Sequence, residues 1–356
     1  MNIQDRAQGA IVGAFIGDAI ALGPHWYYDL DEQHKDYGEW ITTYTEPKKG
    51  RYHEHEKKGN QSQAGYILKL MIKSLVENGE YNQEDFCKKL DEDLFTKMDG
   101  TAHNGPGGYT SQSIRKVYTQ RVEEKLPWDK VGSHADTTEA IERTLALAVR
   151  YALNQKKLSK SISHNTFITQ VDDIVGSMTV AYGAVLAQLI QGEKLDENIS
   201  TKLMSLVKKG ELPFYAVTTD DFKPPKNGVK DPSTIGLFAS PDALLSPSFM
   251  AKVANDKDIK IEPAWKVSLV YGMPCAIYHI LPASYYLAAR FNDDFESAIL
   301  HSLNGGGQNQ ARSILTGALV GAQVGLKNIP QRFIDGLNEK DEILELAKKL
   351  SDNIEA

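Results

Sequence analysis

Leu-Asn-Gly-Gly-Gly-Gln-Asn-Gln-Ala-Arg-Ser-Ile-Leu-Thr-Gly-Ala-Leu-Val-Gly-Ala-Gln-Val-Gly, residues 303–325, joins a glycine-rich turn to a helical pattern. From Ile314 onward apolar residues recur at helical spacing, and Gly317, Gly321 and Gly325 occupy every fourth position. Glycines at that spacing form a smooth stripe, which a neighbouring helix can approach closely. We therefore predict that this helix is central to the fold.

A similar pattern occurs near the N-terminus. Residues 9–17 read Gly-Ala-Ile-Val-Gly-Ala-Phe-Ile-Gly, and residues 317–325 read Gly-Ala-Leu-Val-Gly-Ala-Gln-Val-Gly. Two interpretations stay open. Either the two helices pack directly against each other, which would bring the ends of the chain into one core, or the small residues only fill a crowded interior.

The chain as a whole indicates an all-α fold, because helical periodicity recurs and no set of alternating strands stands out. No Pro/Gly/Ser-rich linker divides the 356 residues, so we predict one compact multi-helix domain, residues 1–356. Residues 24–60 are expected to form a long loop and residues 210–240 an irregular insertion. The expected helices are one that ends before Gly23 and others near 63–77, 83–95, 111–124, 137–153, 171–191, 242–255, 264–290, 294–303, 307–326 and 338–352.

Composition excludes several classes of protein. The net charge is −7 and the basic residues are scattered, so we expect no nucleic-acid partner. Only Cys87 and Cys275 are present, which argues against a disulfide scaffold and for the cytoplasm. We see no signal peptide, and prolines break the longest apolar stretch, residues 269–289, into two expected buried helices rather than a membrane span. The sequence does not indicate an oligomeric state.

Amide side chains cluster at the expected start of two helices. One cluster is residues 308–310, where the preceding Gly306 and Gly307 would let backbone N–H groups approach a ligand, and the other is residues 60–63. Because amides supply dipoles but no charge, the two clusters would suit a hydrogen-bonding small molecule better than Mg²⁺, and we predict neither a metal nor another cofactor. The alternative is that the amides cap helices and face solvent. The residues concerned are Asn60, Gln61, Ser62, Gln63, Gln308, Asn309 and Gln310.

A glycine-dense loop, residues 99–109, is a third candidate binding segment. His103, Gly107, Gly108 and Tyr109 are expected at the rim of the pocket, because the glycines leave room for a ligand. A surface turn is the equally weighted alternative.

Three acids are candidate catalytic residues. Asp18 lies on an otherwise apolar helix and needs a hydrogen-bonding partner or an ion. Asp136 and Glu139 are three residues apart and could perform acid–base chemistry. The favoured alternative is a capping box in which Asp136 accepts a hydrogen bond from the Glu139 amide.

The cluster His53-Glu54-His55 could bind a transition metal through neighbouring imidazoles. We favour a solvated charged loop, because alternate side chains on an irregular segment diverge.

The N-terminal Gly-Asp-Ala segment, the Asn304-Gly-Gly-Gly turn and the Gly-Ala-Leu-Val-Gly-Ala helix resemble the ADP-ribosylglycohydrolase family. That family opens with a glycine-rich helix ending in Gly-Asp-Ala and closes with Gly-Gly-Asp-x-Asp-Thr before a Gly-Ala-Leu-Ala-Gly-Ala helix. The likeness spans most of the chain and is most specific at the two ends. It implies an all-helical fold and an enzyme that uses two magnesium ions to remove ADP-ribose from side chains or small molecules.

The chain departs from the family at the residues expected to bind metal. The two aspartates of the closing motif fall on Gln308 and Gln310, and its threonine falls on Ala311. The early Thr-Asp-Asp-Thr motif falls on residues 60–63, and the glutamate after Gly-Asp-Ala falls on His25 or Trp26. The resemblance therefore implies loss of the two-magnesium site, a pattern similar to the branch of the family that contains jellyfish lens crystallins.

Three functional hypotheses follow. The first is a protein that binds, and as an enzyme would hydrolyse, an ADP-ribose-like or other N-ribosidic ligand without paired magnesium, on a small molecule or on an ADP-ribosylated partner. The second is a non-catalytic structural protein that keeps the fold. The third, which ranks last, is a magnesium-dependent hydrolase with altered ligands.

Overall fold

The protein is all-α, as predicted. The computed structural model describes residues 1–215, 235–239 and 241–355. Over these ranges no strand forms, and extended pairing is confined to isolated bridges such as Ser133 with Gln170. The helices are α1 (Ile3–Ala21), α2 (Leu30–Tyr37), α3 (Gln63–Asn78), α4 (Gln83–Lys89), α5 (Gln112–Tyr118), α6 (Glu139–Arg150), α7 (Gln155–Thr166), α8 (Asp173–Ile190), α9 (Ile199–Lys208), α10 (Pro241–Asn255), α11 (Val267–Tyr271), α12 (Ile277–Arg290), α13 (Phe295–Asn304), α14 (Asn309–Val324), α15 (Gln331–Asp335) and α16 (Lys340–Asp352).

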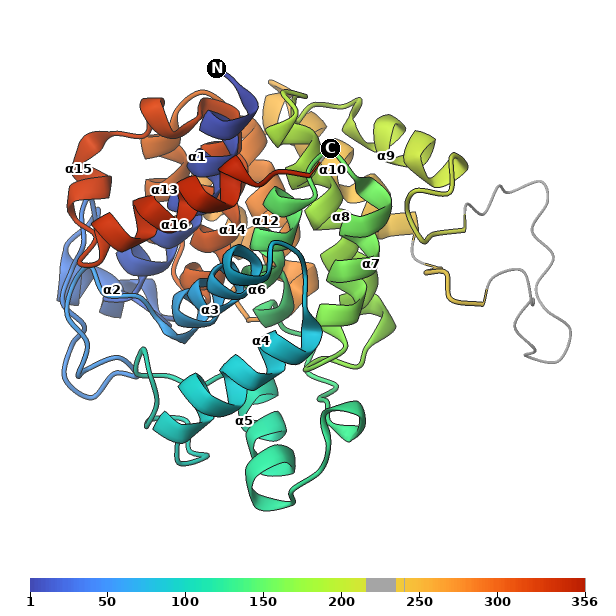
Figure 1. Cartoon of the computed structure of the whole chain (residues 1–356). Coiled ribbons are helices and arrows are strands. Elements are labelled where there is room, and N and C mark those ends of the chain that lie inside the picture. The colour runs from blue at the N-terminus through green and yellow to red at the C-terminus, as the bar shows by residue number, and fades with distance from the viewer. Residues whose placement is uncertain (216–234, 240, 356) are drawn as a thin grey trace, which may run out of the picture.

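Helices α1 and α14 pack directly against each other at the centre of the molecule (Figure 1). A Cβ atom added to Gly13 would lie closer than 3.0 Å to the backbone of Gly317, and the same holds for Gly9 against Gly321. Real Cβ atoms do not approach other atoms so closely, so the backbones can be this near only because both positions are glycine. Of the two interpretations of the repeated pattern, direct helix–helix contact is confirmed.

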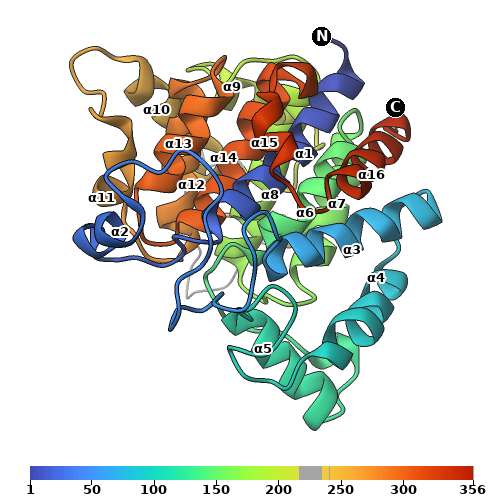
Figure 2. The same cartoon turned by 90° about the vertical axis from the view of Figure 1, so that its left-hand side faces the viewer.

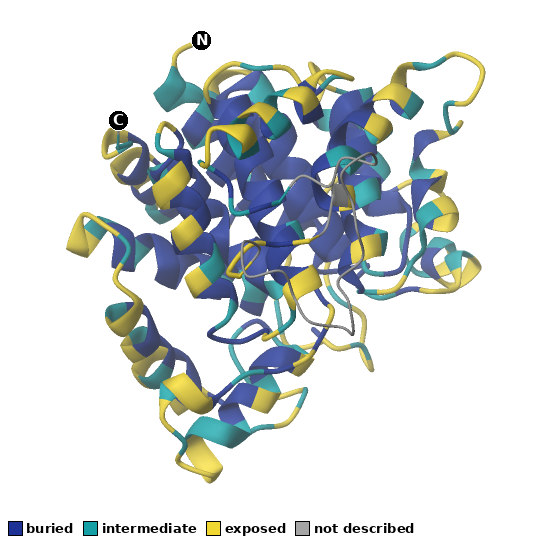
Figure 3. Ribbon diagram, turned by 90° about the vertical axis from the view of Figure 1, so that its right-hand side faces the viewer, coloured by how far each residue is buried: buried dark blue, intermediate teal, exposed yellow. Residues whose placement is uncertain are grey.

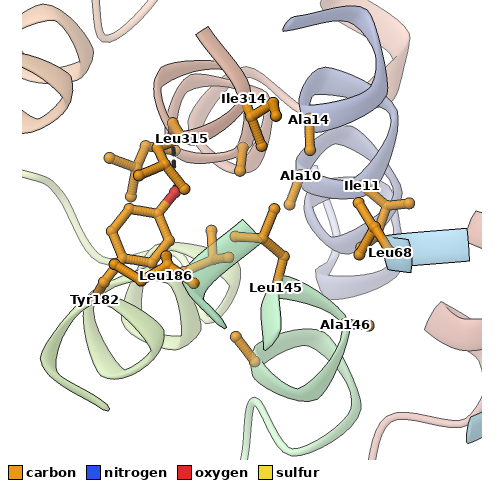
Figure 4. Packing of buried hydrophobic residues seen from close by; sticks show 14 of the residues in the cluster. Ala10, Ile11, Ala14, Leu68, Leu145, Ala146, Tyr182, Leu186, Ile314 and Leu315 are labelled. Carbon is orange, nitrogen blue, oxygen red and sulfur yellow. Dashed lines mark hydrogen bonds between the residues drawn. The ribbon is translucent and has the colours of Figure 1, made fainter. Parts of the chain in front are cut away.

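The other long helices surround this pair. Figure 4 shows Ala10 and Ala14 of α1 beside Ile314 of α14, with Leu145 of α6 completing the layer. Buried apolar side chains from the first helix to the last belong to one connected cluster. Burial of this apolar surface, rather than sheet pairing, holds the elements together.

The two ends of the chain lie at the same end of the molecule (Figures 1 and 2). Arg6 donates hydrogen bonds to the carbonyl oxygens of Ala322 and Gln323, over 3.0 and 3.1 Å. Gln8 donates to the hydroxyl of Ser351 over 2.9 Å. These polar contacts fasten α14 and α16 to α1 outside the apolar core.

The exposure of residues follows the position of their helices in the fold. The inner helices are buried along most of their length, whereas exposed residues gather on the outer helices and loops (Figure 3). One helix, α8, is long and apolar enough to cross a membrane by length and composition, but 83% of it is buried inside the protein. It is therefore accounted for as a core helix.

Several elements differ from the sequence-based expectation. The expected loop at 24–60 contains α2, and α7 and α9 were not predicted. Helix α7 escaped detection because its sequence is mostly polar, with Leu158 and Ile162 among its few buried apolar side chains. Most of the expected insertion, residues 216–234 and 240, lies outside the described residues. Its flanks meet where Phe238 donates a backbone hydrogen bond to Pro213 over 2.7 Å.

Candidate functional site

A half-open pocket lies where the N-terminal ends of α3, α6 and α14 converge. We call it the amide–carboxyl pocket. The polar side chains that line it include Ser62, Gln63, Glu139, Glu142, Gln308 and Gln310. His25 and Tyr109 complete its wall. The structure thus brings together residues from both amide clusters and adds Glu142 and His25, which were not among the predicted site residues.

The pocket is small. The volume free for the centres of water molecules is about 50 Å³, which is room for a few waters. A ligand with several rings could therefore place only one small group inside while the pocket keeps this shape. The rest of such a ligand would lie outside the pocket, beyond the wall that Tyr109 completes.

The glycine-rich turn before α14 is fixed by the protein itself. Gly306 and Gly307 adopt φ angles of 63° and 59°, which favour glycine. The N–H groups of Gly307 and Gln308 donate to the carbonyl oxygens of Tyr27 and Met273, over 2.6 and 2.8 Å. The expectation that Gly306 and Gly307 offer N–H groups to a ligand is therefore wrong for Gly307, whose N–H already has a partner within the chain.

Arg312 also fixes the glycine-rich turn before α14. Its guanidinium is fully buried and donates to the carbonyl oxygens of Ser302 and Gly306 over 2.9 and 2.7 Å. Burial lowers the pKa of Arg312 to about 9. This buried cation fixes the position from which Gln308 and Gln310 enter the pocket.

Only two of the three amides at the start of α14 line the pocket. Gln310 is 6% exposed, and its Nε2 has no hydrogen-bond partner within the protein. Because buried donors normally have partners, this nitrogen is an open position for a ligand or a water. Asn309 instead donates to the carbonyl oxygens of Pro24 and Leu303, over 3.1 and 3.3 Å, so its predicted place in the pocket is wrong.

The second amide cluster divides in the same way. Ser62 and Gln63 line the pocket. Asn60 donates to Glu56 over 2.8 Å and accepts from Asn338 over 2.6 Å, outside the pocket. The amide of Gln61, oriented by its hydrogen bonds, donates to Asp18 over 2.8 Å. For these two residues the predicted pocket position is wrong, since their amides join one part of the chain to another.

Asp18 is buried behind the pocket rather than in it. Its carboxylate accepts hydrogen bonds from the Ser62 hydroxyl over 2.5 Å and from the Ser62 amide over 2.8 Å. Burial raises the pKa of Asp18 to about 7, against the lowering effect of these bonds. The partner expected for this carboxyl is therefore Ser62, and the bond anchors α3 to α1.

The predicted pair of acids, Asp136 and Glu139, is not a pair in space. Asp136 is exposed, lies in a separate open groove and accepts a hydrogen bond from Tyr278 over 2.6 Å. The N-cap of α6 is Thr138, without a side-chain cap, so the expected capping box is also wrong. Glu142, one turn along α6, stands in the place expected for Asp136.

Glu139 and Glu142 form the acidic side of the pocket. The hydroxyls of Thr137 and Thr138 donate to Glu139 and Glu142 respectively, the second over 2.6 Å. Burial raises the pKa of both carboxyls, that of Glu142 to about 8, and the charge of Glu139 adds to the effect on Glu142. The nearby Arg143 makes its hydrogen bonds elsewhere, to Asn165 and Thr169. Burial and mutual repulsion therefore make this pair bind protons more readily than exposed carboxyls do, which is the property that acid–base chemistry uses.

His53 was expected to lie in a solvated charged loop. It is 2% exposed and sits behind His25, so the solvated-loop interpretation is wrong for this residue, although His55 is exposed. Within the described part of the chain, no group of three or more His, Cys, Asp and Glu side chains is placed to hold a metal ion. No periodic pattern in the sequence indicates the burial of His53, because the surrounding loop packs by aromatic contacts rather than as a helix.

Aromatic side chains form the rim of the pocket. Trp26 meets Tyr109 edge-on with ring centroids 4.8 Å apart, and Tyr52 meets the same ring at 5.1 Å. His103 is exposed and stacks on Tyr52 at 5.4 Å, so it reaches the rim without lining the pocket.

Gly107 holds the rim loop against the start of α3, and Gly108 packs against His53. Both adopt left-handed φ angles, 79° and 81°. A Cβ at Gly107 would overlap the backbone of Ser62 and Gln63. These glycines therefore serve close packing of the backbone beside the pocket.

Comparison with known proteins places these features in a family. A family model described as ADP-ribosylglycohydrolase matches residues 1–356. Crystallin J1A from Tripedalia cystophora is 23% identical over 359 residues, covering 98% of this chain and 97% of that protein. A solved structure described as an ADP-ribosylglycohydrolase-related protein complex is similar with a TM-score of 0.64 and 16% identity, covering 99% of each chain, which shows a shared fold.

Proposed function

Because the chain belongs to the ADP-ribosylglycohydrolase family, we propose that the amide–carboxyl pocket binds the ribose end of an ADP-ribose-like or other N-ribosidic ligand without paired magnesium ions. The observation that carries this proposal is the meeting of two carboxyls, the half-buried Glu139 and the buried Glu142, with the amides of Gln308 and Gln310 in one pocket. Carboxyls and amides supply both donors and acceptors, which suits a ring that carries several hydroxyl groups. The small interior volume favours entry of one such ring.

The donor set does not suit two magnesium ions. Mg²⁺ keeps an octahedral shell of oxygen atoms and needs anionic ligands to offset its dehydration. Gln308, Gln310, Ser62 and Gln63 offer only neutral groups. Among the residues that line the pocket, only Glu139 and Glu142 carry a carboxyl group.

The carboxyl pair could also cleave an N-ribosidic bond. The ionised carboxylate would take a proton from water as the water oxygen bonds to the anomeric carbon. The protonated carboxyl would give its proton to the departing nitrogen as the carbon–nitrogen bond breaks. One proton enters the pair and one leaves it, so the pair ends with its original single proton. Which of the two glutamates acts as the acid follows from the side on which the nitrogen departs.

Calorimetric titration with ADP-ribose tests the binding proposal. Affinity that persists in a chelator supports metal-free binding, whereas affinity that appears only with magnesium contradicts it. Gln310→Leu removes the unpartnered donor at constant size and should weaken binding about tenfold, the effect of one lost hydrogen bond. Gln331→Leu, on the exposed face of α15, is the matched control and should bind as the parent does.

Turnover is tested with an N-ribosidic substrate. Glu142→Gln should lower the rate by about 100-fold or more while leaving ribose binding within a few-fold, because it removes proton transfer but keeps a hydrogen-bonding side chain. Glu345→Gln, an exposed acid on α16, is the control.

A second candidate is a structural protein that retains the fold without turnover. The likeness to Crystallin J1A along nearly the whole chain favours it. Absence of turnover together with absence of ADP-ribose affinity in the calorimeter would select this candidate, and turnover lost in Glu142→Gln would reject it.

A further inference from the structure

Three segments far apart in sequence are joined by a line of hydrogen bonds that ends in the pocket. The carbonyl oxygen of Gly107 lies 2.7 Å from Nδ1 of His53. Nε2 of His53 lies 2.7 Å from Nδ1 of His25, and Nε2 of His25 contacts Oε1 of Gln308, whose amide nitrogen would occupy the same place after a half-turn of the side chain. His25 and Gln308 line the pocket, whereas His53 lies behind them.

The contact between Gly107 and His53 determines which ring nitrogens carry a hydrogen along the rest of the line. A carbonyl oxygen only accepts, so Nδ1 of His53 must carry a hydrogen. In a neutral His53 the Nε2 atom is then an acceptor, and Nδ1 of His25 must carry a hydrogen for it. A neutral His25 therefore presents Nε2 as an acceptor. The Gln308 amide must donate to it, and donation comes from its nitrogen.

The orientation with Gln308 Oε1 against His25 would require three hydrogens on the two rings, and so a positive charge on either His25 or His53. Both imidazole rings are 2% exposed, so a charge there would lose nearly all its hydration. The hydrogen-bond partners of the two rings in the described chain are a carbonyl, an amide and each other, with no carboxylate among them. Burial lowers the pKa of His25 and brings that of His53 down to about 4, in agreement with two neutral rings.

We propose that His53 and His25 are positioning residues that hold Gln308 with its nitrogen on His25 and its carbonyl oxygen facing the pocket. The pocket then presents an acceptor, Gln308 Oε1, together with the unpartnered donor Gln310 Nε2. A pair of neighbouring hydroxyl groups matches this arrangement, since one hydroxyl donates to Gln308 and the other accepts from Gln310. The identity of this ligand group rests on the proposed function, whereas the orientation of Gln308 does not.

Trp26 also holds the ring of His25 in place. Its ring stacks on His25 with centroids 4.9 Å apart and planes 8° from parallel. Trp26 adopts φ 72°, a left-handed conformation that non-glycine residues rarely take. The backbone is thus held in an unfavourable conformation at the residue whose ring fixes the plane of His25.

Nitrogen-15 NMR of the histidine rings in the full-length protein tests the orientation without any ligand. Both His25 and His53 should be neutral with hydrogen on Nδ1 at pH 7. A doubly protonated His25, or a doubly protonated His53 with hydrogen on Nε2 of His25, would overturn the proposal, because Gln308 would then turn its oxygen away from the pocket. The resonances are assigned with His25→Asn and His53→Asn.

A substitution at the end of the line supplies the second test. In Gln308→Glu the amide nitrogen that donates to His25 is lost, so at pH 7 either one of the two rings should gain a hydrogen and show the imidazolium signature, or the introduced carboxyl should carry the proton, which its carbon-13 shift reports. Two neutral rings beside an ionised carboxylate at position 308 would also overturn the proposal, since they would show that residue 308 does not contact the ring. His55→Asn, at the exposed neighbouring histidine, is the control and should leave the His25 signals unchanged.

The ligand group is tested by comparing ADP-ribose with its analogue that lacks the 2-hydroxyl of the terminal ribose. The parent protein should prefer the full diol by about tenfold, and His53→Phe should reduce that preference while the melting temperature is recorded in parallel. An undiminished preference in His53→Phe contradicts a positioning role. If ADP-ribose does not bind at all, the proposed function fails, whereas the NMR result still decides the orientation of Gln308.

Discussion

Gly13 of α1 and Gly317 of α14 face each other so closely that a Cβ on either would overlap the carbonyl group of the other. The contact lies at the centre of the fold and joins the two ends of the chain. It sets the distance between α1, which carries Asp18, and α14, which carries Gln310.

Substitution of this glycine pair should therefore be costly. Gly317→Ala is expected to lower the free energy of unfolding by about 2 kcal/mol, since the cost of overpacking exceeds the helix propensity that alanine gains. Denaturant unfolding measures the change. Ser205→Ala, at an exposed position of α9, should change stability by less than about 0.5 kcal/mol. Equal effects of the two substitutions would contradict a close backbone contact.

The contribution of Glu142 to stability should fall as pH rises from about 4.5 to about 8, whereas His25 and His53, whose pKa values burial lowers, act in the opposite direction below about pH 6.5. The pKa of Glu142 is raised from 4.5 to about 8 on folding, so in this range the folded state binds more protons than the unfolded state. Its stabilising contribution is present below pH 4.5 and is lost by pH 8. Asp18 acts in the same direction, with its pKa raised from 3.8 to about 7.

Melting temperatures between pH 5 and 8 measure this effect. Relative to the parent protein, Glu142→Gln should gain melting temperature as pH rises from 5 to 8, because it lacks the carboxyl whose charge burial disfavours. Glu345→Gln should keep the pH dependence of the parent protein. A difference between Glu142→Gln and the parent that does not change with pH would show that Glu142 is not held in its neutral form.

Arg312 should be intolerant of a change that keeps its charge. Arg312→Lys loses the planar set of donors to the Ser302 and Gly306 carbonyls and leaves buried oxygens unpaired. We expect a loss of about 3 kcal/mol in the free energy of unfolding. Arg332→Lys, at an exposed ion pair with Glu296, should cost less than about 1 kcal/mol. Comparable losses at the two sites would refute the assigned role.

Restoring negative charge should create a response to magnesium. The double variant Gln308→Asp with Gln310→Asp is expected to melt at a higher temperature when Mg²⁺ is added, because carboxylates offset the dehydration of the ion. The parent protein should show no such shift. The double variant with asparagine at both positions has the same shape without the charge, and a shift there would mean that charge is not the determining factor.

The sequence by itself determined the elements whose signal is local and periodic. Glycine at every fourth position in residues 9–17 and 317–325 predicted two helices able to approach closely, and the structure confirms the contact. The family likeness, the all-α class and the meeting of Ser62 and Gln63 with Gln308 and Gln310 could also be predicted from short motifs. In each case a few neighbouring residues carry the information.

Only the tertiary structure decided which polar side chains face the pocket. Asn309 and Gln310 are adjacent in sequence, yet the first binds backbone carbonyls and the second enters the pocket, because successive residues on a helix point in different directions. Glu142, and not Asp136, is the partner of Glu139. Helix α6 begins after Asp136, and both glutamates of its first turns line the pocket. The burial of His53 depends on contacts with Gly107 and His25 that lie 54 and 28 residues away along the chain. Local patterns specify helices, whereas the direction of a side chain and its burial depend on packing between distant segments.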